Sequence, residues 1–216
     1  MKWTPNIAYV VGLITTDGNL SKDGRHIDFT SKDMDQILNF KRIIKPNVKV
    51  SYKNSGSGTV YPRIQFSDVK LYKFLISICL HPNKSKTLKE ILVPDELFAD
   101  FIRGCLDGDG CTYSYWDKRW KSSFLLYFSI ASASPSFLNW MQFKIKNLYQ
   151  IKGTIKGDGK SAFQLIYAKR ATVALYKIIY YSNEVVCLTR KRFKLEQALG
   201  IINGQAGVEK LVYSLP

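Results

Sequence analysis

The chain carries the same short motif twice, in the same order relative to a second repeated segment. Residues 12–18 read GLITTDG and recur at residues 104–110 as GCLDGDG, an offset of 92. Further on, residues 71–74 (LYKF) recur at residues 175–178 as LYKI, an offset of 104. An internal repeat constrains the fold strongly, because each copy must form the same supersecondary unit. We therefore predict two similar units, residues 1–94 and 95–216, which pack as one body.

Hydrophobic periodicity gives both units the same order of elements, namely helix, two strands, helix, two strands, helix, which is an α+β fold. Apolar residues at helical spacing or in proline-free runs predict helices. In the first unit these cover residues 7–14, 34–44 and 71–79, and in the second residues 98–106, 137–149 and 171–181. Alternating segments around glycine-rich turns predict strands. They cover residues 25–30, 48–53, 61–66, 124–130, 151–156 and 162–167.

Positive charge is the main feature of the composition. The chain has 32 Lys and Arg against 17 Asp and Glu, a net charge of +15. The two units carry +8 and +7, so the charge is not confined to a tail. A polyanionic partner, most commonly nucleic acid, is the natural inference, although a cationic surface can also serve solubility alone.

Other bulk features exclude several classes of protein. No apolar run reaches the roughly 18 residues of a membrane span, and no signal peptide is visible. We expect an intracellular protein, from a prokaryotic cytoplasm or encoded in an organelle. Because Cys79, Cys105, Cys111 and Cys187 show no CxxC spacing, we interpret them as reduced core residues rather than a disulfide or zinc site.

Each copy of the motif ends in Asp-Gly, at Asp17 and at Asp109. If the two helices pack about a pseudo-two-fold axis, the carboxylates converge, and Gly12 and Gly104 allow the backbones to approach closely. Two carboxylates at short range repel each other, so a divalent cation is expected between them. Hard oxygen ligands favour Mg²⁺, with other divalent cations as alternatives. A single Asp-Gly would more simply be a helix-ending turn, but two in register within a basic protein favour a metal site.

Residues 10–18 (VVGLITTDG) and 102–110 (IRGCLDGDG) resemble the two motifs of single-chain LAGLIDADG homing endonucleases. The resemblance covers nearly the whole chain. It implies two pseudo-symmetric αββαββα units, with motif helices at the centre and two curved antiparallel sheets forming a DNA-binding saddle. It also implies that the last acid of each motif, Asp17 and Asp109, binds the catalytic metals. Thr15 departs from the pattern, because the family motif has an acid there.

The resemblance implies further residues around the metals. Lys84, in a Lys-Ser element of the first unit, and Lys191 in the second occupy the places of the family's catalytic lysines, with Lys86 as the replacement for Lys84. Ser31 and Ser132, at strand ends, could order water at the metal site. Which backbone oxygen joins the metal ligands, and how many metals bind, stay open at this point.

Strand alternation yields candidate DNA contacts, because one face of each sheet packs on helices and the other is free. We expect residues 113–121 to form an aromatic and basic hairpin along the duplex. The candidates are Arg25, Asp28 or Thr30, Lys49, Ser51, Lys53, Arg63, Gln65, Trp116, Lys118, Arg119, Lys121, Lys152, Thr154, Lys156, Gln164 and Tyr167.

These features together predict a monomeric, site-specific DNA endonuclease that makes a metal-dependent double-strand break in a long asymmetric target, as in intron or intein homing. Double-stranded DNA is the expected partner, and intron RNA is a further one. The alternative is a catalytically inactive nucleic-acid binder of the same fold, such as an intron maturase or a DNA-binding regulator. An unrelated basic protein with coincidental Asp-Gly turns is the remaining alternative.

Overall fold

The structure is a computed structural model that describes residues 1–212 apart from 46, 57, 158 and 160, with side chains to residue 204. Ser57 and Asp158, in two of the predicted turns, and residues 213–216 of the predicted second unit lie outside the described residues. No described helix is long and apolar enough to cross a bilayer.

Two units with the same order of elements make up the fold, as the sequence predicts. The first contains α1 (Pro5–Thr16), β1 (Gly18–Leu20), β2 (His26–Thr30), α2 (Met34–Ile44), β3 (Ser51–Asn54), β4 (Val60–Ser67) and α3 (Val69–Ser77). The second contains α4 (Phe98–Asp107), β5 (Gly110–Trp116), β6 (Phe124–Ser132), α5 (Pro135–Tyr149), β7 (Thr154–Gly157), β8 (Phe163–Tyr167), α6 (Lys169–Ile179) and α7 (Thr189–Val212). A short 3-10 turn at Lys84–Lys86 follows α3, and another at Asp95–Leu97 precedes α4. The α+β fold class is confirmed.

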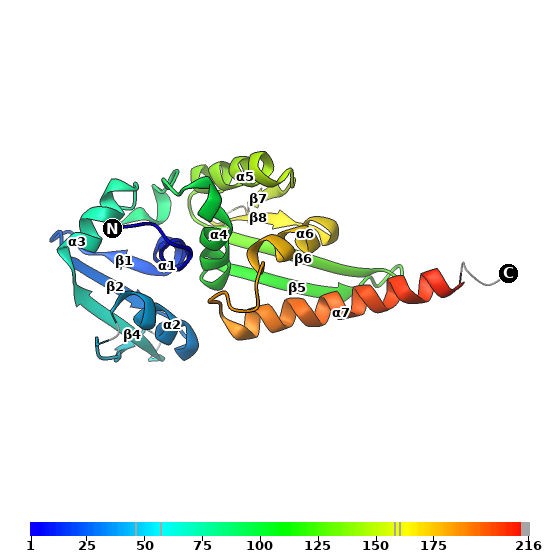
Figure 1. Ribbon diagram of the computed structural model, residues 1–216, viewed down its shortest axis with the longest axis horizontal. Coiled ribbons are helices and arrows are strands. Elements are labelled where there is room, and N and C mark those ends of the chain that lie inside the picture. Colours follow the sequence, from blue (N-terminus) through cyan, green and yellow to red (C-terminus); the bar gives the residue numbers. More distant parts are fainter. Residues whose placement is uncertain (46, 57, 158, 160, 213–216) are drawn as a thin grey trace.

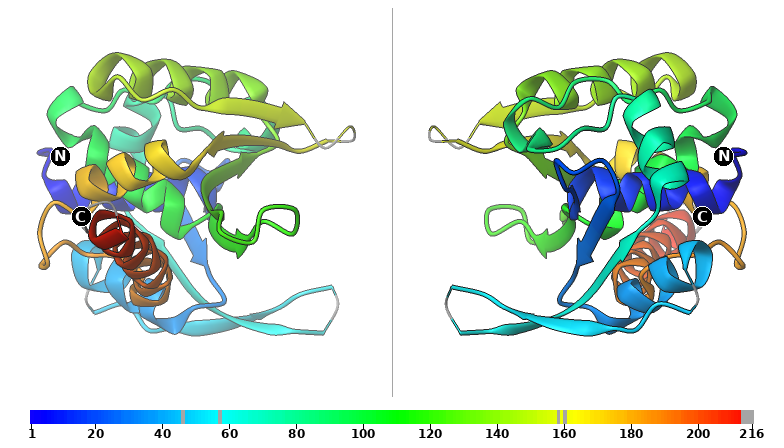
Figure 2. Two further views of the ribbon diagram at one scale, coloured as in Figure 1. Left: turned by 90° about the vertical axis from the view of Figure 1, so that its right-hand side faces the viewer. Right: turned by 90° about the vertical axis from the view of Figure 1, so that its left-hand side faces the viewer.

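The two sheets have the same topology. The first has the strand order β1-β2-β4-β3 and the second β5-β6-β8-β7, and every neighbouring pair is antiparallel. All strands of the first sheet precede residue 94 and all strands of the second follow it. Figure 1 shows the sheets on opposite sides of the central helices α1 and α4, and Figure 2 shows the β3–β4 and β7–β8 hairpins projecting to the same side. The unit boundary at residue 94 is compatible with this layout and stays a prediction.

Local sequence signals fix where the helices begin. Thr4 caps α1 by accepting a hydrogen bond from the Ile7 N–H at 3.2 Å, and Pro5 fills the first helical position. In α5, Ser134 is the capping residue and Pro135 fills the first helical position. A capping hydroxyl satisfies a backbone donor that the helix leaves unpaired, and proline has no N–H to leave unpaired.

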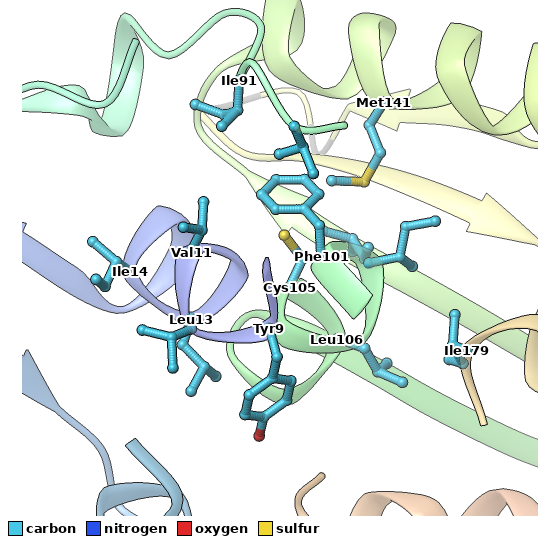
Figure 3. Packing of buried hydrophobic residues seen from close by; sticks show 14 of the residues in the cluster. Tyr9, Val11, Leu13, Ile14, Ile91, Phe101, Cys105, Leu106, Met141 and Ile179 are labelled. Carbon is cyan, nitrogen blue, oxygen red and sulfur yellow. The ribbon is translucent and has the colours of Figure 1, made fainter. Parts of the chain in front are cut away.

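The core is continuous through the centre of the molecule, where α1 packs directly on α4. Tyr9, Leu13, Phe101 and Leu106 are fully buried there, as Figure 3 shows. Helices α5, α6 and α7 also contact the second sheet, on the face that carries its buried residues. Burial of this large apolar surface is the main contribution to the stability of the arrangement.

One helix was missed, and two expectations from the sequence are wrong. No helix was predicted over α7, which follows the αββαββα order of the second unit and runs along β5 (Figure 1). Cys79 and Cys111 are exposed and Cys187 is half-buried, so only Cys105 is a core residue, although all four thiols are free. Tyr167 is fully buried beside Phe128 and cannot contact DNA.

Candidate catalytic centre and nucleic-acid interface

The motif helices cross at their glycines. A Cβ on Gly12 would lie 2.4 Å from the Phe101 carbonyl oxygen, and one on Gly104 would lie 2.1 Å from the Tyr9 carbonyl oxygen. Both distances are far below van der Waals contact, so only glycine permits this approach of the two backbones. The crossing brings the C-terminal ends of α1 and α4, which carry the Asp-Gly sequences, next to each other.

Asp17 and Asp109 therefore line one pocket of about 520 Å³. Burial, followed by the negative charge of Asp109, raises the pKa of Asp17 to about 7. Asp109 is exposed as a residue, yet the protein around its carboxylate reduces hydration enough to raise its pKa as well. Lys191 and Lys84 oppose both shifts through their positive charge. Two poorly hydrated carboxylates that repel each other are suited to share a cation.

A second pocket, of about 170 Å³, lies on the other side of Asp109. Each pocket combines parts of both units. The larger joins the strand end of the first unit, including Ser31, to the end of α4, and the smaller joins the strand end of the second unit, including Ser132, to Thr15 and Thr16 of α1. The pseudo-symmetry thus produces two related recesses, with Asp109 lining both.

Lys191 is buried beneath the end of α4, and its ammonium group is fully engaged. Its Nζ donates to the carbonyl oxygens of Leu106, Asp107, Gly108 and Gly110 at 2.6 to 2.9 Å. A cation at this position satisfies carbonyls that the helix end leaves unpaired and offsets the helix dipole. Burial lowers the pKa of Lys191. With its donors occupied, Lys191 is placed to hold the end of the motif rather than to reach a substrate.

Lys84 occupies the corresponding place in the first unit. It is buried and its Nζ donates to the Gly18 carbonyl oxygen, which matches Gly110 in the repeat. Burial lowers the pKa of Lys84 to about 8, while Asp109 and Asp17 raise it. Lys86 is exposed. Of the two lysines that the sequence left open, the structure places Lys84 against the motif.

At one motif position only the second unit has an acid, and both residues there, Asp107 and Thr15, form hydrogen bonds within the protein. Asp107 is buried and accepts hydrogen bonds from the Tyr9 hydroxyl at 2.8 Å and the Leu188 N–H at 2.6 Å. Burial raises its pKa to about 6. Thr15, its counterpart, donates to the Val11 carbonyl oxygen of its own helix at 2.7 Å. Asp107 lines the larger pocket, whereas Thr15 lines the smaller one, so the departure of Thr15 from the family motif leaves the carboxylates of the larger pocket in place.

Side chains that the sequence did not single out also surround the larger pocket. Arg190 forms a bidentate ion pair with Asp33, with both distances 2.6 Å, and so joins α7 to the first unit. Gln36 is almost fully buried, accepts from the Ser31 hydroxyl at 2.5 Å, and has no partner for its Nε2. Only the tertiary fold shows that these residues lie near the motif, because they are distant from it in sequence.

Strand register divides the candidate DNA contacts between faces. In the first sheet, Asp28 pairs with Gln65, and Thr30 with Arg63, which also faces Ser51. These residues alternate with the buried Ile27, Phe29 and Ile64, so they share the face without core residues. Lys53 lies two residues beyond Ser51 on that face. Arg63 forms an ion pair with Asp28.

The remaining candidates are more scattered. Arg25 and Lys49 are exposed but lie outside the strands, and Arg25 is 3.8 Å from Asp23. In the second unit Lys156 pairs with Gln164 in the sheet, and Thr154 and Lys152 lie at or before the start of β7. Lys118, Arg119 and Lys121 are exposed at the tip of the β5–β6 hairpin, which the sequence predicts.

Trp116 is exposed and stays a predicted contact, although the register places it on the same face as Phe124 rather than on the open face. It pairs with the buried Phe124, and the two rings lie 5.2 Å apart, edge to face. Tyr113, Tyr115 and Tyr127 lie on the open face instead. A one-residue change of register exchanges the faces, so the pairing partner was needed to assign them.

No protein-family model matches the chain, and no curated protein matches its sequence. Solved structures match with low sequence identity. Full-length DUF199/WhiA from Thermatoga maritima superposes with a TM-score of 0.59 at 15% identity over 97% of this chain, which spans 66% of that protein, just under two thirds of its length. The homing endonuclease I-WcaI, bound to its DNA recognition sequence, gives 0.62 at 14% identity, with 89% and 88% of the two chains covered.

A third structure is the homing endonuclease I-DmoI in complex with DNA and Mn, with a TM-score of 0.54 at 19% identity and 83% and 98% of the two chains covered. The chain therefore has the LAGLIDADG fold in its single-chain form, with both motif helices and both sheets in one polypeptide.

Proposed function

We propose that this protein is a site-specific DNA endonuclease that makes a metal-dependent double-strand break in a long, asymmetric target, the activity used in homing. One observation carries the proposal. The C-terminal ends of two helices from two similar units bring Asp17 and Asp109 into one pocket at the centre of the molecule.

The donor set fits a hard divalent cation. The described residues contain no group of three or more His, Cys, Asp and Glu side chains placed to hold a metal. Two carboxylates are therefore the charged ligands available, and water and phosphate oxygens would complete the shell, as Mg²⁺ prefers. When bound, the cation supplies Lewis-acid activation at the phosphorus and charge neutralisation of the leaving oxygen. The solved structure of I-DmoI, which has the same fold, is a complex with DNA and Mn.

The chain's own residues prepare this centre. Asp17 and Asp109 must be deprotonated to act as ligands, and their raised pKa values disfavour that state until a cation is present. Lys191 keeps the end of α4 in place through the carbonyls that it contacts. Lys84 holds the end of the first motif through the Gly18 carbonyl oxygen. Its ammonium group has further N–H donors, which could bind a phosphate oxygen.

The two recesses beside Asp109 match the needs of a double-strand break. Cleavage of a duplex requires two scissile phosphates, one on each strand, and each recess is built from the strand end of one unit and the motif end of the other. In this proposal Ser31 and Ser132 order water in the two recesses. The net charge of +15, divided between both units, favours a duplex that contacts both sheets.

A binding protein without cleavage is the second candidate, because the fold is not confined to homing endonucleases and also occurs in DUF199/WhiA. The presence of both carboxylates in the central pocket favours cleavage. A plasmid carrying the DNA that flanks the protein's own gene, incubated with Mg²⁺, Mn²⁺ or EDTA, tests the choice. Linear product that needs the metal supports the endonuclease. Specific binding with no cut under any metal would contradict it.

A further inference from the structure

The open face of the second sheet differs in chemistry from that of the first. Its residues alternate with the buried Phe124, Leu126, Phe128 and Ile130, and the register places the cross-strand pairs Tyr115–Leu125, Tyr113–Tyr127 and Ser129–Ile166 on it. No Lys, Arg, Asp or Glu occupies these six positions. Farther along, the face carries Gln164 beside Lys156.

Three tyrosines on this face, Tyr113, Tyr127 and Tyr115, form a stacked group that we call the tyrosine ladder. The Tyr113 and Tyr127 rings lie 5.0 Å apart at an interplanar angle of 20°, and the Tyr115 and Tyr127 rings 6.2 Å apart at 22°. Because Tyr127 stacks with both of the other rings, stacking within the ladder occupies part of the aromatic faces that unpaired bases would need. That arrangement suits apolar contact with a groove better than stacking with unpaired bases, which needs an open ring face.

The open face of the first sheet carries polar side chains at positions where the second sheet has none that can read a base by an amide or a carboxylate. Because Gly18 pairs with Phe29 as Gly110 pairs with Ile130, Asp28 corresponds to Ser129, and Gln65 to Ile166. Amide and acidic side chains hydrogen-bond to the edges of adenine and cytosine in the major groove. An isoleucine at the same place offers no such bond, and pressed against a polar base edge it would leave that edge unsatisfied.

We propose, building on the function proposed above, that the second sheet reads its half of the DNA target through thymine methyl groups, with Tyr113, Tyr115 and Tyr127 as the reading residues. The thymine methyl is the apolar group that base pairs display in the major groove. The matching substrate is a duplex whose second half-site has thymines facing this sheet, while the first half-site is read by hydrogen bonds.

Position along the strand locates the thymines. β5 begins directly after Asp109 and leads away from it. At about 3.4 Å per residue, Tyr113 lies roughly 13 Å and Tyr115 roughly 20 Å from the catalytic aspartate. With about 3.4 Å per base pair, these distances correspond to about four to six base pairs from the centre of the cut. Exposed Lys118, Arg119 and Lys121 at the hairpin tip can hold the phosphates beside these base pairs.

Selection of bound duplexes from a randomised pool provides the substrate for the test. The change in base preference caused by Gln65→Ala identifies the half-site of the first unit. Each thymine is then replaced by deoxyuridine, which removes only the methyl group. We expect binding to weaken about 3- to 5-fold for each methyl lost four to six base pairs out in the second half-site, from the value of a buried methyl. In the first half-site the change should stay below about 2-fold.

Two variants assign the effect to the ladder. Tyr127→Ser should make binding insensitive to deoxyuridine in the second half-site. His26→Ser, at the corresponding place in the first sheet, should leave that sensitivity intact. If Tyr127→Ser fails to fold, as a thermal melt would show, Tyr113→Ser provides the same comparison within the ladder.

Equal effects of deoxyuridine in both half-sites, or tighter binding of single-stranded than of duplex nucleic acid, would overturn the inference. These results are distinct from failure of the proposed function. A protein that responds to thymine methyls but never cuts would retain the inference and lose the nuclease, and one that cuts without this response would do the reverse.

Discussion

The two units agree at their motif helices and differ on their sheets. At the centre, Gly12 matches Gly104, Asp17 matches Asp109, and a buried lysine supports each helix end. On the open faces, Asp28 and Gln65 of the first sheet stand where the second has Ser129 and Ile166. Chemistry at the centre needs one carboxylate from each side, whereas each sheet would meet a different half of an asymmetric target. Residues at the centre are alike because the proposed reaction needs both of them. Residues on the two open faces differ because each sheet would meet a different DNA sequence.

The largest effect should follow loss of either central carboxylate. Asp17→Asn and Asp109→Asn should each reduce cleavage by more than about 10²-fold, because each removes a ligand of a shared centre. The double variant should be hardly worse than the singles, since residues that act as a unit are not additive. Cleavage rates under single-turnover conditions measure this, with DNA affinity as the control. If either variant cleaved DNA at the wild-type rate, the two aspartates would not be equivalent in the reaction.

Next in size is the cost of separating the motif helices. Gly12→Ala and Gly104→Ala should each lower the free energy of unfolding by about 1–3 kcal/mol or more, because the added methyl meets backbone at 2.4 and 2.1 Å. Gly200→Ala in α7 is the matched control, since nothing lies within 4 Å of its new Cβ. That variant should gain up to about 1 kcal/mol from helix propensity. Chemical denaturation provides the values, and a stable Gly12→Ala variant would contradict the close crossing.

The pH dependence of stability should have the same sign in both units. A carboxyl whose pKa is raised on folding binds its proton more tightly in the folded state, so it destabilises the fold as pH rises. For Asp17 this loss begins near the unfolded pKa of about 4 and is complete above about 7. Without metal, Asp17→Asn should therefore be more stable than the wild type at pH 8, by about 1–4 kcal/mol at about 1.4 kcal/mol per pKa unit.

The advantage of Asp17→Asn should disappear below about pH 4, and adding Mn²⁺ should reduce it at pH 8. Asp109→Asn should show the same direction, because its pKa is also raised. Denaturation curves across the pH range check this. An asparagine variant that is less stable than the wild type at pH 8 would show that the carboxylate is stabilised by its surroundings instead.

Phosphate contacts should contribute the smallest single effects. Lys53→Ala and Lys156→Ala, one on each sheet, should each weaken binding on all sequences and flatten the salt dependence by about one unit, because each releases about one counterion fewer. Lys73→Ala, exposed on α3, serves as the control. If only one sheet's lysine changes the slope in fluorescence anisotropy titrations, the duplex contacts one unit alone.

Much of the fold follows from the sequence because the motif repeats and local periodicity agree. The predicted helix over residues 34–44 coincides with α2, whose apolar residues recur at helical spacing. α7 escaped prediction because Gly200 and Gly204 interrupt its sequence and its apolar residues form no clear stripe. Its first turn is fixed by tertiary contacts instead, through Lys191 on α4 and Arg190 on Asp33.

At the site, the sequence identifies the two aspartates but does not identify the lysine. The repeat identifies Asp17 and Asp109 without a structure, because both end the same motif. The sequence could not separate Lys84 from Lys86, two residues apart in a 3-10 turn, since only the packing shows which one is buried. Nor could it assign the face of Trp116, because strand periodicity gives alternation but not the face that the helices cover.

The central claim is that the two units share one metal centre. Manganese binding, followed by electron paramagnetic resonance on the protein with and without its selected duplex, tests this most directly and does not depend on cleavage. Wild type, Asp17→Asn and Asp109→Asn are compared. If the centre is shared, either substitution should eliminate the tightest-bound ion. If instead one variant binds that ion as tightly as the wild type, the aspartates act separately and the shared centre is refuted.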